Sequence, residues 1–224
     1  MTKRILLTGG SSEIGNAIYK KLSENIDYAI GEQYFQSEEL TNSSDKYYCD
    51  FEIYEGGLID SFIDRNKKID VLINCAGVLG EVPFEELTVE DYDRVMGINS
   101  RAPYILCSEA FGYMKEDGGK IINISSFTTK YGMGRNNTIH YAASKATLDI
   151  LTIGLAKIGA PYNILVNSIS PGVIDTEKQD KSKADRIPLK RLGAVEDIAN
   201  MVNYLVSDKG NFITGQNIFI AGGE

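Results

Sequence analysis

The chain has 224 residues, of which 43% are hydrophobic and 24% are charged, and this length and composition are typical of one folded domain. Its formal net charge of −8 argues against non-specific binding to nucleic acid and to an anionic membrane surface, so we expect neither partner. No apolar run approaches the roughly 20 residues that a membrane span needs, and the first residues indicate a strand rather than a signal peptide.

Apolar runs and helical patterns alternate along the whole chain. The predicted strands are 4–8, 27–34, 46–49, 69–73, 120–124, 163–169 and 216–220. The predicted helices begin near residue 14 and span 56–66, 88–115 (one long helix or two joined helices), 138–158 and 195–207. Such alternation implies parallel strands joined by right-handed crossovers. The sequence therefore predicts an α/β fold: a single Rossmann-type three-layer α/β/α domain over 1–224, with a mostly parallel sheet of about seven strands.

The first predicted strand ends at a glycine-rich turn, residues 9–15, and a helical pattern begins within that turn. Strand, glycine-rich turn and helix form the layout of a phosphate cradle, in which backbone N–H groups and the helix N-terminus face a pyrophosphate. The spacing is not G-x-G-x-x-G, so a plain left-handed turn is the alternative. Because the turn joins a buried strand to a helix, we favour the cradle.

Small and polar residues follow several predicted strand ends, at 8–9, 74–77, 125–126 and 170–172. The carboxyl ends of parallel strands are where a doubly wound sheet binds its ligands. We therefore expect one binding cleft along this edge of the sheet.

Tyr141 and Lys145 are four residues apart on a predicted helix, so they project from one face. A lysine ammonium a few ångströms from a phenol favours the phenolate, which would lower the pKa of Tyr141 and let it exchange a proton near neutral pH. Taken alone the pair is weak, because tyrosine and lysine share this spacing on many solvated helices. The preceding residue, His140, is the one histidine of the chain, and we expect a ring beside the active site rather than a catalytic base.

Three cysteines, an odd number, have no metal-ligand spacing. Together with the single histidine, they predict no metal site. Buried reduced thiols of this kind indicate a cytoplasmic protein.

Taken in register, these motifs resemble the short-chain dehydrogenase/reductase family over essentially the whole chain. The turn with its preceding Thr8 resembles T-G-x-x-x-G-x-G, and residues 74–77 resemble N-N-A-G. Tyr141 and Lys145 match the Y-x-x-x-K pair.

The C-terminal third also resembles this family. Residues 171–176 are similar to its P-G-x-x-x-T segment under the nicotinamide amide. Residues 187–193 and 214–216 most resemble the 3-oxoacyl-carrier-protein reductase branch.

The resemblance implies an NAD(P)-dependent oxidoreductase that interconverts a carbonyl and an alcohol on a small-molecule substrate by hydride transfer. Reduction of a 3-oxoacyl thioester is the first expectation. The alternatives are a reductase of sugar or secondary-metabolite synthesis and a catalytically silent dinucleotide-binding protein. The catalytic residues that it implies are Asn99, Ser126, Tyr141 and Lys145. The residues that it implies for the cofactor are Gly9, Ser11, Ser12, Ile14, Gly15, Tyr34, Asp50, Phe51, Asn74, Ala76, Gly77, Asn99, Tyr141, Lys145, Pro171, Gly172, Val173 and Thr176.

The resemblance also assigns roles. Tyr141 would donate a proton to the substrate carbonyl oxygen, while Lys145 would lower the tyrosine pKa and hold the ribose hydroxyls. Ser126 would hydrogen-bond the carbonyl oxygen, or else be a strand-end capping serine. Asn99 would break the helical hydrogen bonding and hold a water that links Lys145 to solvent, or else be only a helix-kink residue. Asp50 would contact adenine, or else cap a helix.

The sequence departs from the family pattern at Glu13, which replaces the middle glycine of the loop. Its charge would repel pyrophosphate if it faced the cofactor, so we expect it to face solvent. The segment between Thr176 and Pro188 is short for the family's substrate lid, and little chain follows Gly223 to cover a site.

The end of the second predicted strand decides the cofactor. A carboxylate there favours NAD, and basic residues favour the 2′-phosphate of NADP. The deciding positions, Tyr34 and Phe35, are not acidic, Glu32 lies too early in the strand, and Ser12 stands where many NADP-dependent relatives have arginine. We expect NADP(H), with NAD possible.

The helices predicted at 88–115 and 138–158 have apolar faces too wide for one sheet contact. Together with the family resemblance, they predict a homo-oligomer, a tetramer.

Overall fold

The computed structural model describes residues 2–132, 136–177 and 179–224, and within them it forms one sheet of seven parallel strands in the order β3-β2-β1-β4-β5-β6-β7. The strands are β1 Lys3–Leu7, β2 Tyr28–Tyr34, β3 Asp45–Tyr48, β4 Val71–Asn74, β5 Gly119–Ile124, β6 Ile164–Pro171 and β7 Asn217–Ile220. The helices are α1 Glu13–Ser23, α2 Leu58–Asn66, α3 Val89–Met96, α4 Ala102–Met114, α5 Ile139–Gly159 and α6 Val195–Val206. The predicted fold is confirmed.

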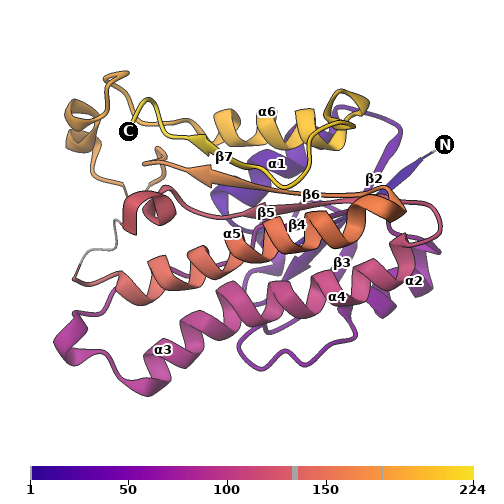
Figure 1. Cartoon of the computed structure of the whole chain (residues 1–224), viewed down its shortest axis with the longest axis horizontal. Coiled ribbons are helices and arrows are strands. Elements are labelled where there is room, and N and C mark those ends of the chain that lie inside the picture. Colours follow the sequence, from indigo (N-terminus) through magenta and orange to yellow (C-terminus); the bar gives the residue numbers. More distant parts are fainter. Residues whose placement is uncertain (1, 133–135, 178) are drawn as a thin grey trace.

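Helices cover both faces of the sheet (Figure 1). Helices α1 and α6 lie side by side on one face, and α2, α4 and α5 pack on the other. Strand β1 shows how the sequence supports both layers, because successive strand side chains point to opposite faces. Ile5 and Leu7 belong to the core beneath α1 and α6, while Leu6 belongs to the core beneath α2 and α4. None of the helices in the described residues is long and apolar enough to cross a membrane.

Helix α2 begins at Leu58, two residues later than predicted, because the backbone of Gly56 and Gly57 is left-handed, with φ values of 134° and 93°. The predicted helix at 88–115 is two helices joined by a π-helical segment, Gly97–Arg101. Such π segments interrupt the regular hydrogen bonding of an α-helix and often occur at functional sites. The local break expected around Asn99 is therefore confirmed.

Strands β1 and β4 are neighbours although β2 and β3 come between them in the chain. Chain connections leave such neighbouring strands in opposite directions, which opens a crevice at their carboxyl ends. This crevice lies at Leu7 and Asn74, and the carboxyl ends of β5 and β6 extend the same edge.

Candidate active site

The glycine-rich turn is held by its own side chains and by β2. Ser12 Oγ caps α1 by accepting a hydrogen bond from Gly15 N at 3.0 Å, and it donates to Gly9 O at 2.8 Å. Gly9 N donates to Gln33 Oε1 at 3.0 Å. A Cβ on Gly15 would overlap Gly9 O and lie 3.0 Å from Gly10 Cα. The turn is therefore compact, and its backbone comes close to the start of the helix, as a phosphate cradle requires.

A hollow of about 240 Å³, which we call the β2 hollow, lies beside this turn at the end of β2. The predicted cofactor residues that line it are Gly9, Ser11, Ser12, Tyr34, Asp50, Phe51, Ala76 and Gly77. Asp50 does not cap α2, whose N-cap is Gly57; its Oδ1 instead accepts from Glu52 N at 2.9 Å. The helix-cap alternative for Asp50 is therefore wrong.

A second hollow, of about 500 Å³, lies at the ends of β5 and β6, and we call it the Tyr141 hollow. The predicted site residues that line it are Ser12, Ile14, Gly77, Ser126, Tyr141, Lys145, Pro171, Gly172, Val173 and Thr176. The residues that line both hollows are Ser12, Cys75, Gly77 and Val78. The two hollows thus adjoin each other beside the N-terminus of α1, and we call them together the cleft.

Three predicted site residues support the cleft from behind its lining. Gly15 is buried under the turn. Asn74 is 2% exposed, and its Nδ2 donates to Asn123 Oδ1 at 2.8 Å. Its side chain therefore faces the sheet interior and does not line either hollow. Asn99 is fully buried.

Asn99 joins the π-helical segment to the cleft wall. Its Oδ1 accepts from Val78 N, and its Nδ2 donates to Val78 O, both at 2.9 Å. The same Nδ2 donates to Ser144 Oγ at 3.0 Å. Asn99 therefore fixes the backbone between the two hollows and links it to the helix of Tyr141. Sequence reasoning missed Ser144 because its partner lies 45 residues away.

Lys145 is buried, with 4% of its surface exposed, and its Nζ donates to Ile124 O at 2.8 Å. Burial lowers the pKa of Lys145 to about 8, although Cys75 and Asp149 oppose the shift. The Nζ lies 6.0 Å from the centre of the Tyr141 ring. Both predicted catalytic side chains of α5 thus meet in one hollow.

The structure corrects the expected pKa of Tyr141. Burial of the phenol raises its pKa, and the hydrogen bond with Ser126 opposes this shift. The ammonium of Lys145 donates to Ile124 O and does not bring the tyrosine pKa below its ordinary value. The expectation of a Tyr141 pKa below the ordinary tyrosine value is therefore wrong for this structure, although a nearby ammonium still favours the phenolate over a neutral neighbour.

Ser126 follows β5 and is 8% exposed. Its Oγ accepts hydrogen bonds from Thr128 Oγ1 at 3.0 Å and from Thr128 N at 3.3 Å. Two bonds to the lone pairs leave the hydroxyl hydrogen available to a partner in the hollow, where Tyr141 lies. Sequence reasoning missed Thr128, although an ST-type spacing of two residues was a signal for it.

His140 braces the cleft from outside. Its side chain is buried, and its Nε2 is hydrogen-bonded to Gly80 O in the segment that follows β4. It does not line the Tyr141 hollow, so it has no direct access to a ligand there. The expectation of a ring beside the site, not of a base within it, agrees with this placement.

The cleft fits a dinucleotide. It has two compartments joined at a helix N-terminus, where backbone N–H groups favour a pyrophosphate. A Cβ on Gly77 would lie 3.2 Å from Asn99 Oδ1 and 3.3 Å from Lys145 Nζ, so a glycine avoids crowding between the two compartments. One nucleotide can therefore lie at the β2 hollow and the other beside Lys145.

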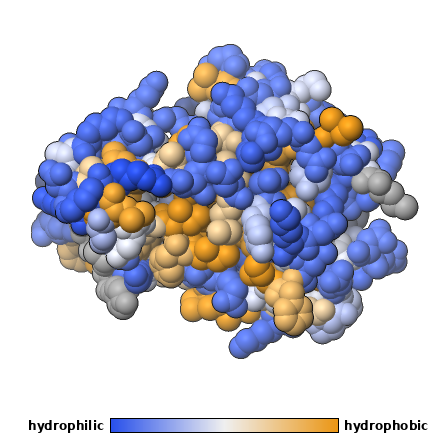
Figure 2. Space-filling model, turned by 90° about the horizontal axis from the view of Figure 1, so that it is seen from above, coloured by the Kyte–Doolittle hydropathy of each residue, from blue (hydrophilic) through white to orange (hydrophobic). Residues whose placement is uncertain are grey.

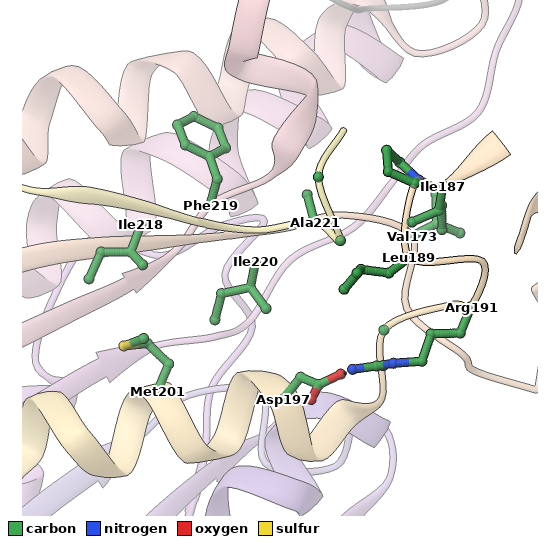
Figure 3. Close-up of a pocket in the computed structure, with 14 residues that line it drawn as sticks. Val173, Ile187, Leu189, Arg191, Asp197, Met201, Ile218, Phe219, Ile220 and Ala221 are labelled. Carbon is green, nitrogen blue, oxygen red and sulfur yellow. Dashed lines mark hydrogen bonds and ion pairs between the residues drawn. The ribbon is translucent and has the colours of Figure 1, made fainter.

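A third hollow, of about 550 Å³, lies between α6, β7 and the segment that follows Ile187 (Figure 3). Its wall is mostly apolar, and the ion pair of Arg191 Nη1 with Asp197 Oδ2, at 2.8 Å, lies at its edge. Figure 2 shows apolar surface gathered on the face of the molecule that is seen from above. This hollow contains none of the predicted catalytic residues.

Comparison with known proteins agrees with the geometry. Residues 55–224 match a family model described as enoyl-(acyl carrier protein) reductase. The chain is 33% identical to the 3-oxoacyl-[acyl-carrier-protein] reductase FabG of Chlamydia pneumoniae, over 99% of this chain and 96% of that protein.

Two solved structures have the same fold. A blue fluorescent protein from a metagenomic library, in complex with NADPH, has a TM-score of 0.89 and 32% identity, and the match covers 99% of this chain and 97% of that one. Acetoin dehydrogenase from Enterobacter cloacae has a TM-score of 0.91 and 27% identity, and the match covers 100% and 96%. With this fold, this cleft and these relatives, the chain belongs to the short-chain dehydrogenase/reductase family of NAD(P)-dependent oxidoreductases.

Proposed function

We propose that Tyr141 is the proton donor of this NAD(P)-dependent oxidoreductase, which interconverts a carbonyl and an alcohol. One observation carries the proposal: Tyr141, Ser126 and the buried ammonium of Lys145 line one hollow, where hydrogen bonding by Ser126 acts to lower the pKa of the phenol. A proton donor, a second hydrogen-bond donor and a fixed positive charge are the groups that a carbonyl oxygen needs as it becomes an alkoxide.

A bound nicotinamide dinucleotide supplies the hydride in the reduction. Tyr141 gives its phenolic proton to the carbonyl oxygen, and Ser126 donates a hydrogen bond to the same oxygen and orients it. The positive charge of Lys145 stabilises the phenolate that Tyr141 becomes. Thr128 takes no part in the proton transfer. Its hydroxyl donates a hydrogen bond to Ser126 Oγ, so that the serine hydrogen points into the hollow. In the reverse direction Tyr141 takes the hydroxyl proton of the alcohol, and the oxidised dinucleotide, when bound, would accept the hydride.

The residues at the end of β2 favour NADP(H) over NAD(H) as the cofactor of this enzyme. Glu32, the acidic residue nearest the end of β2, is fully buried, and its Oε2 accepts from Asn42 N at 2.7 Å and from Ser43 N. The side chain of Glu32 therefore does not line the β2 hollow. Tyr34, which does line it at the end of the strand, is not acidic. The NADPH complex of the metagenomic relative supports this preference.

Calorimetric titration with both reduced cofactors tests the preference. We expect NADPH to bind at least about tenfold more tightly than NADH, which corresponds to one or two hydrogen bonds to a charged phosphate. Equal affinities would contradict it.

The substrate class that we propose is a 3-oxoacyl thioester, on the strength of the FabG relative, which matches almost the whole chain. A small hydroxyketone is the second candidate, because the match to the acetoin dehydrogenase structure covers 100% of this chain. Loss of NADPH absorbance with acetoacetyl-CoA, compared with acetoin and a simple ketone, separates them. A higher kcat/KM for the thioester supports the first candidate, and a higher value for acetoin replaces it with the second.

We also propose that the enzyme assembles as a homotetramer. Exposed apolar side chains lie on α4 and α5, including Tyr104, Ile150 and Ile153, which are 53%, 71% and 41% exposed. Another copy of the chain would bury these faces. Light scattering at micromolar concentration should give a tetramer and, for Ile150→Glu, a smaller species; a monomer for the unchanged protein would contradict the proposal.

A further inference from the structure

Residues 176–177 and 179–187, which we call the cover segment, border the Tyr141 hollow through Thr176 and Gln179. The C-terminal end of this segment is firmly held. Ile187 is 2% exposed, and Leu189 N donates to Gly222 O at 3.1 Å. Figure 3 shows Ile187 and Leu189 together at one end of the third hollow, the one between α6 and β7. This end of the cover segment is therefore part of the packed domain.

The other end is held differently. The backbone is fixed as far as Asp175, whose N donates to Gly193 O at 2.7 Å. Two residues later, Glu177 N donates to Glu13 Oε1 at 3.3 Å. Among described residues, the other hydrogen bonds of 176–186 stay within 175–190; they include Gln179 N to Thr176 O and the bond of Lys183 to Gln179.

Glu13 comes from the opposite side of the cleft. It is the first residue of α1, directly after the capping Ser12, and it lines the Tyr141 hollow together with Thr176 and Gln179. Its side chain is exposed, as expected, but it leans across the hollow and contacts the backbone of Glu177. A glycine, which the family pattern has here, offers no acceptor for this bond.

We propose that Glu13 is a positioning residue whose carboxylate holds Glu177, at the start of the cover segment, across the cleft, over the place where the substrate binds. The inference rests on the proposed function, since it assigns the substrate to the Tyr141 hollow. In this arrangement two of the departures of the chain from its family pattern, Glu13 and the short cover segment, act together. A short segment has few residues with which to close over a ligand, and Glu13 supplies the missing attachment.

Three substitutions test the proposal. Glu13→Ala removes the acceptor, while Glu13→Gln keeps an acceptor oxygen without the charge. Glu177→Ala removes a neighbouring charge but keeps the backbone donor, so it is the matched control. Each variant is measured for the KM and kcat of the best carbonyl substrate, for NADPH affinity at low and high salt, and for hydrogen exchange of the cover segment.

We expect Glu13→Ala to raise KM about two- to tenfold, the range for one exposed hydrogen bond to a charged group, with kcat changed less than KM. Glu13→Gln should recover most of the loss, and Glu177→Ala should match the unchanged protein. Hydrogen exchange across 176–187 should accelerate in Glu13→Ala and not in Glu13→Gln. NADPH affinity should stay within about twofold in all three variants.

Two results would overturn the proposal. Unchanged exchange in Glu13→Ala would show that Glu13 does not hold the segment. Tighter NADPH binding in both Glu13 variants, with a larger gain at low salt, would show that the carboxylate acts on the pyrophosphate instead. Exchange is measured without turnover, so it tests the attachment even if every carbonyl tried is inert, an outcome that would count against the proposed function alone.

Discussion

The charge on Lys145 should set the upper pH limit of carbonyl reduction. Burial lowers the pKa of Lys145 to about 8 and raises that of Tyr141 above its usual value, so the lysine loses its proton first as the pH rises. About nine tenths of the lysines are charged one pH unit below that pKa, and about a tenth are charged one unit above it. Because the phenolate of Tyr141 depends on this charge, kcat should fall about tenfold per pH unit above pH 8.

Two substitutions test whether this fall in kcat above pH 8, the basic limb of the pH profile, is due to Lys145. The carboxylate of Asp149, one helical turn beyond Lys145 and 9% exposed, raises the lysine pKa. A charge roughly 6 Å away at an effective dielectric of about 20–40 is worth about 1.4–2.8 kcal/mol, so Asp149→Asn should move the limb about one to two units lower. Cys75 can raise the lysine pKa only as a thiolate. Burial raises the pKa of Cys75 itself to about 11, so its thiol is uncharged near pH 8 and Cys75→Ser should leave the limb in place.

The assay is kcat against pH from 6 to 10, with NADPH and the carbonyl substrate both saturating at each pH. Calorimetric titration of NADPH at the same pH values separates an effect on binding from one on proton transfer. A rate that stays constant to pH 10, or a limb that Asp149→Asn does not move, would refute the reasoning.

Two further predictions follow from the geometry of the cleft. Gly15→Ala should weaken NADPH binding more than about tenfold and lower the melting temperature, because the new methyl group overlaps Gly9 O and overpacking costs about 1–3 kcal/mol. Calorimetry measures the affinity and thermal unfolding the melting temperature. An affinity equal to that of the unchanged protein would contradict the compact turn. Thr128→Val should lower kcat about two- to tenfold while NADPH affinity is unchanged, because Ser126 loses a hydrogen bond that orients it. Steady-state kinetics test this. An unchanged kcat would show that Thr128 does not position Ser126 for catalysis.

Local patterns in the sequence predicted much of the fold and of the cleft. Tyr141 and Lys145 were found because a helix places residues four apart on one face, a rule that needs no tertiary contact. The glycine-rich turn was found because strand, turn and helix are contiguous. The break at Asn99 depended on the family resemblance, since no local signal separates an asparagine in a π-helical segment from one in a regular helix.

Long-range contacts and burial were not predictable in the same way. Glu13 meets Glu177 across 164 positions, and Gln33 meets Gly9 across 24, so neither pair has a sequence pattern. The raised pKa of Tyr141 depends on how much of the phenol the surrounding chain covers, which composition does not report. The cytoplasmic location stays a prediction from the cysteines, and the tetramer stays one from exposed apolar faces.

The measurement that tests the central claim most directly is the turnover of Tyr141→Phe with NADPH and a saturating carbonyl substrate. This substitution removes the phenolic proton and leaves the ring in place. We predict that kcat falls about 10²- to 10⁴-fold, the usual contribution of a positioned general acid, while NADPH affinity stays within about twofold. A variant that keeps more than about a tenth of the wild-type kcat would contradict the assignment of Tyr141 as the proton donor.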